Sequence, residues 1–303
     1  MFATLLGGLP PPPLGPDATV DGLVEAAVRA QEAAGLDPVT DGGLRGDAPL
    51  VESWRATARL TDLAVKQAVD GPYSWGRSVG GTAAERTAAT LARAEALNLV
   101  VRELAAAGCP LIEIHEPAAT AIGTDPAERA FFREAHGRLL DGVAESHLSL
   151  VLTGGNADAA GIETILSAPY SSLAVDLIAG PDNWRLVSAT PGDLGIVCGV
   201  LSVAPGSPDG PETLLWAAGY AASTGGRGPS RVGLATASSM RHLSWDDALR
   251  KMERLGAAAR LADVPLDERV QSLDPRAVSS RSAALGRVDP PPSGDSDRSH
   301  DPT

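Results

Sequence analysis

Residues 82–117 read TAAERTAATLARAEALNLVVRELAAAGCPLIEIHEP, and this stretch contains one complete passage from a helix to a strand. Its first part is an alanine-rich run that starts at Thr82, with Glu85 three positions on, which is the spacing of a capping box. The run closes at Gly108, a residue type that commonly ends helices. A short, mostly apolar segment follows, as in a parallel strand buried on both faces. The stretch predicts a helix over 82–107 and a strand over 110–117.

The same alternation continues in both directions along the chain. Further helices are expected over residues 21–34, 125–145, 211–222 and 244–262, with a short helical region over 154–168. Further strands are expected over residues 3–8, 36–41, 63–69, 148–152, 173–178, 194–201 and 232–236. Eight strands, most of them followed by a helix, predict an α/β fold: a single-domain (β/α)8 or TIM barrel over residues 1–264.

The rival architecture is a doubly wound open sheet with a dinucleotide-binding turn. That fold would place Gly-x-Gly-x-x-Gly after the first strand, but here Gly7 and Gly8 precede a run of four prolines. Beyond the barrel the apolar pattern weakens. We expect one extra helix over 265–285 and a disordered tail over 286–303, because the tail has almost nothing to bury.

Composition narrows the class of partner. The chain carries 25 basic and 38 acidic side chains, a net charge of −13, so it has no field that attracts nucleic acid. The start of the chain has no basic region before its apolar residues, and no apolar run is long enough for a membrane span. We therefore expect a cytoplasmic protein that takes a small-molecule ligand; a protein partner stays open.

Functional side chains of a barrel gather at the carboxyl ends of its strands. We expect substrate to contact Asp41, Arg45, Asp47, Tyr73 and Trp75. We expect chemistry from His115, Glu116, His147 and Asp176. His147 lies at the start of its strand or, if that strand begins earlier, near its tip.

Each candidate also has a structural reading. An Asp or Ser after a strand commonly caps the next helix, which is an even alternative at Asp41 and Ser238. Aromatic packing over a barrel mouth is as good an explanation of Tyr73 and Trp75 as a ligand wall. Asp176 is the hardest to dismiss, because it interrupts an apolar strand and a buried carboxylate without a partner is costly.

Several segments together resemble the catalytic barrel of cobalamin-independent methionine synthase, over about residues 3–262. They are LLGGLP (5–10), AGLDPVTDGG (34–43), GPYSW (71–75), GCPLIEIHEPA (108–118), and the stretch from SHLSLVL to LAVDL (146–177). The resemblance implies a zinc-binding (β/α)8 barrel that transfers a methyl group from a methylated folate to homocysteine.

The resemblance also implies where the zinc ligands would lie, and there the sequence departs from the family. The family's ligands are a His and a Cys spaced His-x-Cys, a Glu, and a final Cys. His147 matches the first, whereas Ser149, Asp176 and Ser238 occupy the other three positions. Hydroxyls stay protonated at neutral pH and are poor zinc ligands. Both cysteines, Cys109 and Cys198, lie elsewhere.

The amino-acid anchor departs as well. Two acids of the family are expected to hold the amino group of homocysteine, and Gly43 and His115 stand in their places. A normal zinc-dependent homocysteine methyltransferase is therefore not expected.

Three functions stay open, and the sequence leaves undecided whether the protein is an enzyme. The first is a methyl- or alkyltransferase in which His115, His147 and Asp176 form a metal site, or His147 acts as a general base. The second is a non-catalytic barrel that binds a ligand or partner. The third is a metal-free decarboxylase-like barrel related to uroporphyrinogen decarboxylase, although that enzyme's Arg-rich entry segment is absent.

Overall fold

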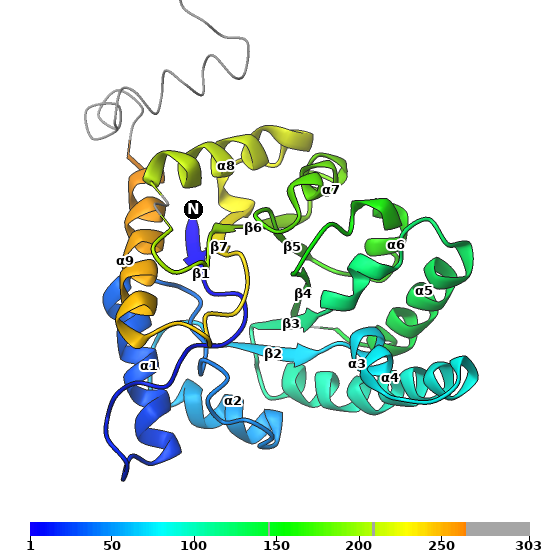
Figure 1. Ribbon diagram of the computed structural model, residues 1–303, viewed down its shortest axis with the longest axis horizontal. Helices are drawn as coiled ribbons and strands as arrows, with labels where there is room; N and C mark the ends of the chain where they lie inside the picture. Colours follow the sequence, from blue (N-terminus) through cyan, green and yellow to red (C-terminus); the bar gives the residue numbers. More distant parts are fainter. Residues whose placement is uncertain (145, 208–209, 265–303) are drawn as a thin grey trace, which may run out of the picture. The chain divides into compact units, whose positions relative to one another are not determined.

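A curled parallel sheet forms the centre of the protein. The computed structural model describes residues 1–144, 146–207 and 210–264. The described strands are β1 (Phe2–Thr4), β2 (Lys66–Asp70), β3 (Leu111–His115), β4 (His147–Leu152), β5 (Ser172–Asp176), β6 (Gly195–Leu201) and β7 (Val232–Thr236). They form one seven-stranded sheet in the order β1-β7-β6-β5-β4-β3-β2 (Figure 1). The expected α/β barrel class is confirmed.

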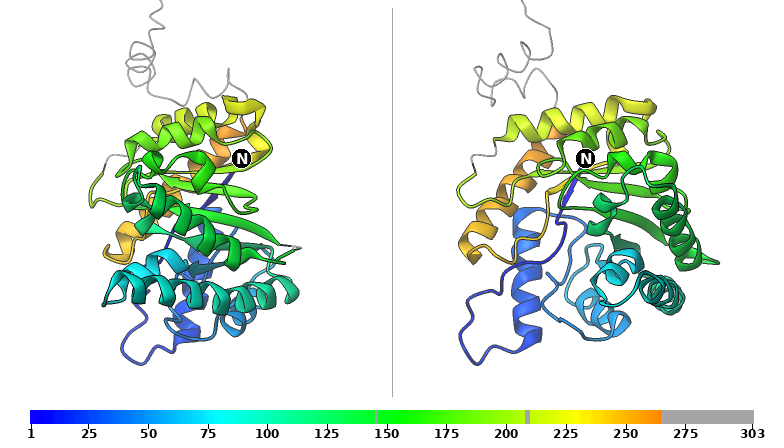
Figure 2. Two further views of the ribbon diagram at one scale, coloured as in Figure 1. Left: turned by 90° about the vertical axis from the view of Figure 1, so that its right-hand side faces the viewer. Right: turned by 45° about the vertical axis from the view of Figure 1, so that its right-hand side comes forward.

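Helices lie around the outside of the curled sheet (Figures 1 and 2). They are α1 (Val20–Ala34), α2 (Leu50–Ala58), α3 (Pro72–Ser78), α4 (Ala83–Ala106), α5 (Pro126–Leu140), α6 (Ile162–Ile165), α7 (Trp184–Ala189), α8 (Pro211–Ser223) and α9 (Trp245–Ala262). Five 3-10 segments join them: η1 (Pro117–Ala121), η2 (Asp158–Ala160), η3 (Pro181–Asn183), η4 (Thr224–Gly226) and η5 (Pro229–Arg231).

The expected strand over 36–41 is not a regular strand, which corrects the prediction, yet it closes the barrel. Its backbone bonds to both neighbours: the Asp37 N–H donates to Ala3 O at 2.9 Å, and the Val39 N–H to Ala64 O at 2.9 Å. Only one bridge, Val39 with Val65, has strand geometry. The segment thus takes the place of an eighth strand between β1 and β2.

The buried Gln31 side chain of α1 explains why the strand pairing of segment 36–41 does not continue at Thr40. Its amide nitrogen donates to Thr40 O at 2.7 Å, and its amide oxygen accepts from the Thr40 N–H at 3.0 Å. A side chain therefore satisfies backbone groups that a longer strand would have paired with β2.

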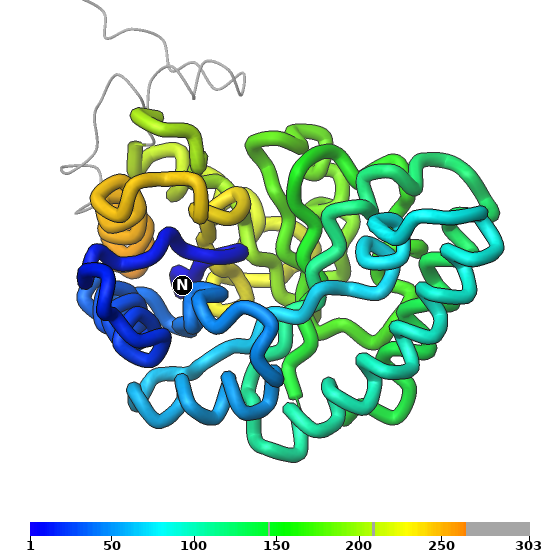
Figure 3. The backbone as a smooth tube through the Cα atoms, turned by 60° about the horizontal axis from the view of Figure 1, so that its bottom comes forward, coloured from blue at the N-terminus to red at the C-terminus, as the bar shows by residue number. Residues whose placement is uncertain are grey.

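The two ends of the barrel unit meet. Residues Met1–Asp263 form one unit, in which β1 lies against β7 and α9 lies beside β1, in orange (Figure 3). The Met1 ammonium donates to Asp263 at 2.8 Å.

Within the described residues, no helix combines the length and apolarity that crossing a membrane would need. The expected helix over 265–285 and tail over 286–303 lie outside the described residues.

Two apolar clusters fill the unit. The larger lies between the sheet and the helices. The smaller consists of Leu6, Val151, Ala174, Val197 and Ala235, one residue from each of five strands or strand ends. These five side chains form an apolar plug inside the barrel, and a cavity is present on either side of it.

Candidate functional site

A cavity of about 530 Å³ lies at the carboxyl ends of the strands, and we call it the carboxyl-end cavity. Its charged and polar lining comes from Thr40, Asp41, Arg45, Asp47, Ser53, Gln67, Asp70, Arg93, His115, Thr153, Ser239 and Arg241. This is the mouth where barrel enzymes carry their active sites. Asp41, Arg45, Asp47 and His115, all expected at the site, do line it.

Glycines let three loops meet at one wall of this cavity. A Cβ atom on Gly8 or on Gly43 would lie 2.3 Å from the Arg241 guanidinium, so a larger residue would displace it. The Arg241 Nη2 donates to Gly43 O at 2.6 Å. The loops after β1 and β7 and the loop that follows residue 40 are therefore held together by an arginine at the rim.

Lys66, Glu113 and His115 form a row of contacts that runs from the barrel interior to the floor of the cavity. Lys66 Nζ lies 2.7 Å from Glu113 Oε1, and both side chains are 2% exposed. The other carboxylate oxygen of Glu113 lies 3.2 Å from His115 Nε2. Since His115 lines the cavity, the carboxylate orients this imidazole from beneath and leaves its Nδ1 for a ligand.

The electrostatics of this group favour a charged carboxylate. Burial by itself would raise the pKa of the Glu113 carboxyl, but the Lys66 ammonium and His115 outweigh it and lower that pKa. In the neutral imidazole, a proton on Nε2 is the one that this carboxylate can accept, and the lone pair then lies on Nδ1. In that tautomer His115, which lines the cavity, carries a proton acceptor.

Two arginines that line the cavity also carry hydrogen-bond donors without a partner among the described residues. Arg45 Nη1 is 2.6 Å from Asp21 Oδ1, but its Nε is buried with no partner among the described residues. The Nε of Arg93 is likewise buried and unpartnered in the part of the chain described, while its guanidinium lies 5.6 Å over the Trp75 ring. These two arginines can donate to an anionic group.

Tyr73 and Trp75 do not line the cavity. Tyr73 is fully buried, and its hydroxyl donates to Glu128 at 2.6 Å. Burial raises the pKa of this phenol. The expectation that Tyr73 contacts substrate is corrected, because its ring packs into the helical layer against Phe131 and Phe132. Trp75 contacts the cavity only indirectly, because the guanidinium of Arg93, which lines the cavity, lies over its ring.

Glu116 and Asp176 are bound to the backbone. The Glu116 carboxylate is fully buried and accepts from the N–H groups of Tyr73 at 2.9 Å and Ser74 at 2.6 Å. It thereby caps the start of α3. Asp176, 2% exposed, accepts from Gly154 at 3.1 Å, Ile178 at 2.9 Å and Ala179 at 2.8 Å.

Both carboxylates were expected to carry chemistry, and the structure corrects this. Neither lines the cavity; each instead holds loops together. Three backbone donors offset the cost of burying the Asp176 carboxylate, which explains how this residue can interrupt an apolar strand.

His147 lies at the opposite mouth of the barrel. It is the first residue of β4 and pairs with Leu111, whereas His115 pairs with Val151. Four residues along a strand separate His147 from His115, about 13 Å. The expected metal site of His115, His147 and Asp176 is therefore not assembled, and His147 cannot be a general base in the carboxyl-end cavity.

The zinc that the resemblance implies does not fit the residues present. Ser149 lies below the apolar plug with His147, Asp176 is occupied by three backbone donors, and Ser238 does not line the cavity. Among the described residues, no group of three or more His, Cys, Asp or Glu side chains is placed to hold a metal ion.

Sequence reasoning missed several residues of the site. Arg93 lies inside a long helix. Asp70 ends β2 one residue beyond the expected end of that strand, and Thr153 follows β4, whose end at Leu152 was expected. Lys66 and Glu113 did carry a signal: each is a charged residue next to apolar ones in a segment expected to be a strand, and the two strands are neighbours.

Comparison with known proteins supports the fold. The chain resembles the solved structure of a B12-independent methionine synthase from Shewanella sp. W3-18-1, in complex with selenomethionine, with a TM-score of 0.75 and 15% identity over 89% of this chain and 99% of that one. It also resembles a methyltransferase from Methanosarcina mazei, with a TM-score of 0.50 and 15% identity over 72% of this chain and 64% of that one. No protein-family model and no curated protein sequence matches the chain. At these identities the likeness shows the TIM-barrel fold alone.

Proposed function

We propose that the protein is a methyl- or alkyltransferase-like barrel that binds a small, carboxylate-bearing molecule in the carboxyl-end cavity, with His115 as its proton acceptor. The observation that carries this is the line from Lys66 through Glu113 to His115, which ends in the cavity floor. The unpartnered Nε atoms of Arg45 and Arg93 supply donors for the carboxylate.

In the proposed reaction, an acceptor O–H, N–H or S–H group lies against Nδ1 of His115. His115 takes the proton as the acceptor heteroatom attacks the methyl or alkyl carbon of a donor molecule. The new heteroatom–carbon bond forms while the donor–carbon bond breaks, and the donor leaves with the electron pair. The proton on His115 then returns to solvent or to the donor.

The transfer is tested with ¹³C-methyl donors. Methylated folate and methylated thiols are incubated with panels of small carboxylates that carry hydroxyl, amine or thiol groups, and ¹³C NMR detects transfer. We expect His115→Gln to lower the rate at least about 100-fold, the lower range for a general base. His242→Gln, a histidine outside the cavity, is the matched control and should keep the rate. Equal rates in wild type and His115→Gln would overturn the assignment.

Growth of a methionine auxotroph tests the inherited activity. We expect no rescue, because neither zinc thiolate ligand of the family is present. Robust growth would show that the protein makes methionine and that the zinc argument is wrong.

A second candidate is a barrel that binds the same class of ligand without turnover. It is favoured by Glu116 and Asp176, since both carboxylates near the strand ends serve the backbone. In that case calorimetry would detect a carboxylate ligand that Arg93→Gln weakens, and no ¹³C product would form from any donor.

A further inference from the structure

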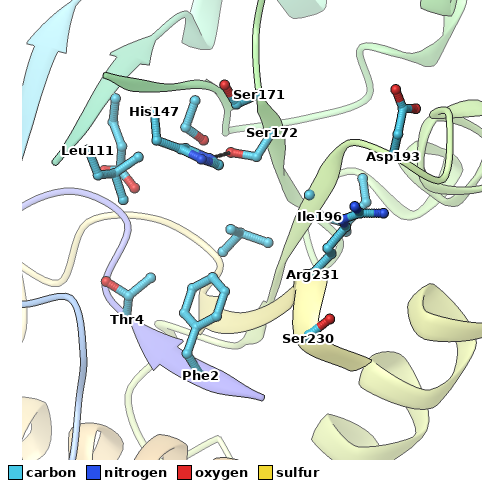
Figure 4. Close-up of a pocket in the computed structure, with 14 residues that line it drawn as sticks. Phe2, Thr4, Leu111, His147, Ser171, Ser172, Asp193, Ile196, Ser230 and Arg231 are labelled. Atoms are coloured by element: carbon cyan, nitrogen blue, oxygen red, sulfur yellow. Dashed lines mark hydrogen bonds between the residues drawn. The ribbon is translucent and has the colours of Figure 1, made fainter. Parts of the chain in front are cut away.

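A second cavity lies at the amino ends of the strands, on the other side of the apolar plug. We call it the amino-end cavity; its volume is about 350 Å³ (Figure 4). In barrels this mouth is usually the one that serves stability, and its layer is filled by bulky side chains. Here Thr4, Ser149, Ser172 and Gly195 line it, and their small size leaves the space open.

Ser149 gives the clearest sign of a ligand. Its side chain lines the cavity, the residue is 1% exposed, and its Oγ has no hydrogen-bond partner among the described residues. A buried hydroxyl without a partner is costly, and alanine would remove the cost without loss of packing elsewhere. A hydroxyl in such a place is explained if a bound molecule completes its hydrogen bonds.

His147 and Ser172 form the polar wall next to it. His147 Nε2 lies 2.8 Å from Ser172 Oγ, and Figure 4 shows the ring reaching across from β4 to Ser172. Burial lowers the pKa of the His147 imidazole, so the ring is neutral at pH 7. This pair leaves Nδ1 of His147 for further hydrogen bonding.

The charges around the cavity cancel. Glu113 lines it deep in the barrel but is paired with Lys66 at 2.7 Å. At the rim, Asp193 and Arg231 bring one charge of each sign. A charged ligand inside the cavity would therefore find no countercharge beyond the exposed rim. Ser171 and Ser230 add two further hydroxyls, and the apolar part of the lining comes from Phe2, Leu111, Ile196 and Val197.

We propose that the amino-end cavity is a second ligand-binding site, for a small uncharged molecule with an apolar body and a hydroxyl head that bonds to Ser149. The site is separate from the carboxyl-end cavity, and it stands whether or not the transferase assignment holds. Its volume is near the lower end of the range for small-molecule sites, about 300 to 1,000 Å³.

Four probes that share one ring test the chemistry of the site: benzyl alcohol, toluene, benzoate and benzylamine. Binding to the full-length protein is followed by amide chemical shifts in NMR. We expect benzyl alcohol to shift the amides of residues 147–149, 172 and 195, and to bind at least about fivefold more tightly than toluene, the value of one net hydrogen bond. Benzoate and benzylamine should bind more weakly still.

Ser149→Ala gives two readouts of opposite sign. It should weaken benzyl alcohol about fivefold while leaving toluene unchanged. It should also raise the Tm of the ligand-free protein, by about 2 to 4 °C, because it removes an unsatisfied hydroxyl. Ser149→Val, which fills the space, should abolish binding of both probes.

Thr153→Val, on the same segment at the opposite mouth, is the matched control and should leave benzyl alcohol binding unchanged. The proposal is overturned if benzyl alcohol and toluene bind equally, if a charged probe binds most tightly, or if Ser149→Ala leaves benzyl alcohol affinity intact.

Discussion

Lys66 and Glu113 show how individual residues in the barrel interior depend on one another. They lie on neighbouring strands, two residues out of register, since Lys66 pairs with Leu111 and Ala68 with Glu113. Desolvation of two charges is repaid only because the pair is close and Glu113 also reaches His115. Because either residue alone would be a buried charge without a counterion, the two are interpretable only as a pair.

Glu113→Leu and Lys66→Met should therefore each destabilise the protein by about 3 to 5 kcal/mol, the usual cost of an unpaired buried charge. The double variant Lys66→Met, Glu113→Leu should recover most of that loss, because both charges are removed. Urea unfolding of the four proteins of the cycle measures this. If the double variant were as unstable as the sum of the single ones, the two residues would not be coupled.

His147 should make folding stability depend on pH. Its pKa in the folded protein is lowered below the ordinary 6.5, first by burial and in spite of Glu113. The unfolded chain then binds more protons, so the stability is full above about pH 6.5 and falls as the pH drops through the lowered pKa. In His147→Gln the fall in unfolding free energy between about pH 7 and 5.5 should be smaller. Unchanged slopes, with His242→Gln as control, would contradict this.

The helices differ in how far along the chain the residue that caps their start lies. The capping box of α4 is complete: the Thr82 hydroxyl accepts from the Glu85 N–H, and Glu85 accepts from the Thr82 N–H at 2.7 Å. Both residues lie within four positions, so the sequence predicts it and the structure confirms it. The start of α3 is capped by Glu116, over forty positions away, and α3 was not predicted.

Thr82→Ala should cost about 1 kcal/mol of unfolding free energy, the typical value for an N-cap. Thermal or urea unfolding measures the change. Thr87→Ala, an exposed position inside the same helix, should be neutral or slightly stabilising, because alanine is the better helix former. An equal effect at both positions would mean that the cap contributes nothing.

At the scale of the whole molecule, barrel closure rests on few hydrogen bonds. The segment from Asp37 to Thr40 joins β1 to β2, and a single side chain, Gln31, holds its far end. Closure matters to function, because the loop that follows this segment supplies Asp41 and Arg45 to the carboxyl-end cavity.

Gln31→Met should destabilise the protein by about 2 to 3 kcal/mol, since the Thr40 N–H and C=O lose their buried partner while the packed volume is kept. Hydrogen exchange at the amides of Val39 and Thr40 should quicken more than exchange at β4 or β5. Uniform quickening across the sheet would show that Gln31 acts on global stability alone.

The sequence by itself determined the alternation of strands and helices, the barrel class, the cap of α4 and the carboxyl-end residues Asp41, Arg45, Asp47 and His115 of the cavity. These follow from patterns within a few residues of one another. The end of the barrel at which a side chain lies depends on where its strand begins. If the strand begins a few residues earlier or later, the side chain lies at the other end of the barrel.

Only the tertiary structure decided that His147 faces the amino end, that Glu116 and Asp176 serve the backbone, and that Arg93 reaches the site from a helix. The physical reason is that partners far apart in the chain fix the use of each polar group. A carboxylate that meets several backbone donors becomes a structural support, and a serine that meets none is left for a ligand.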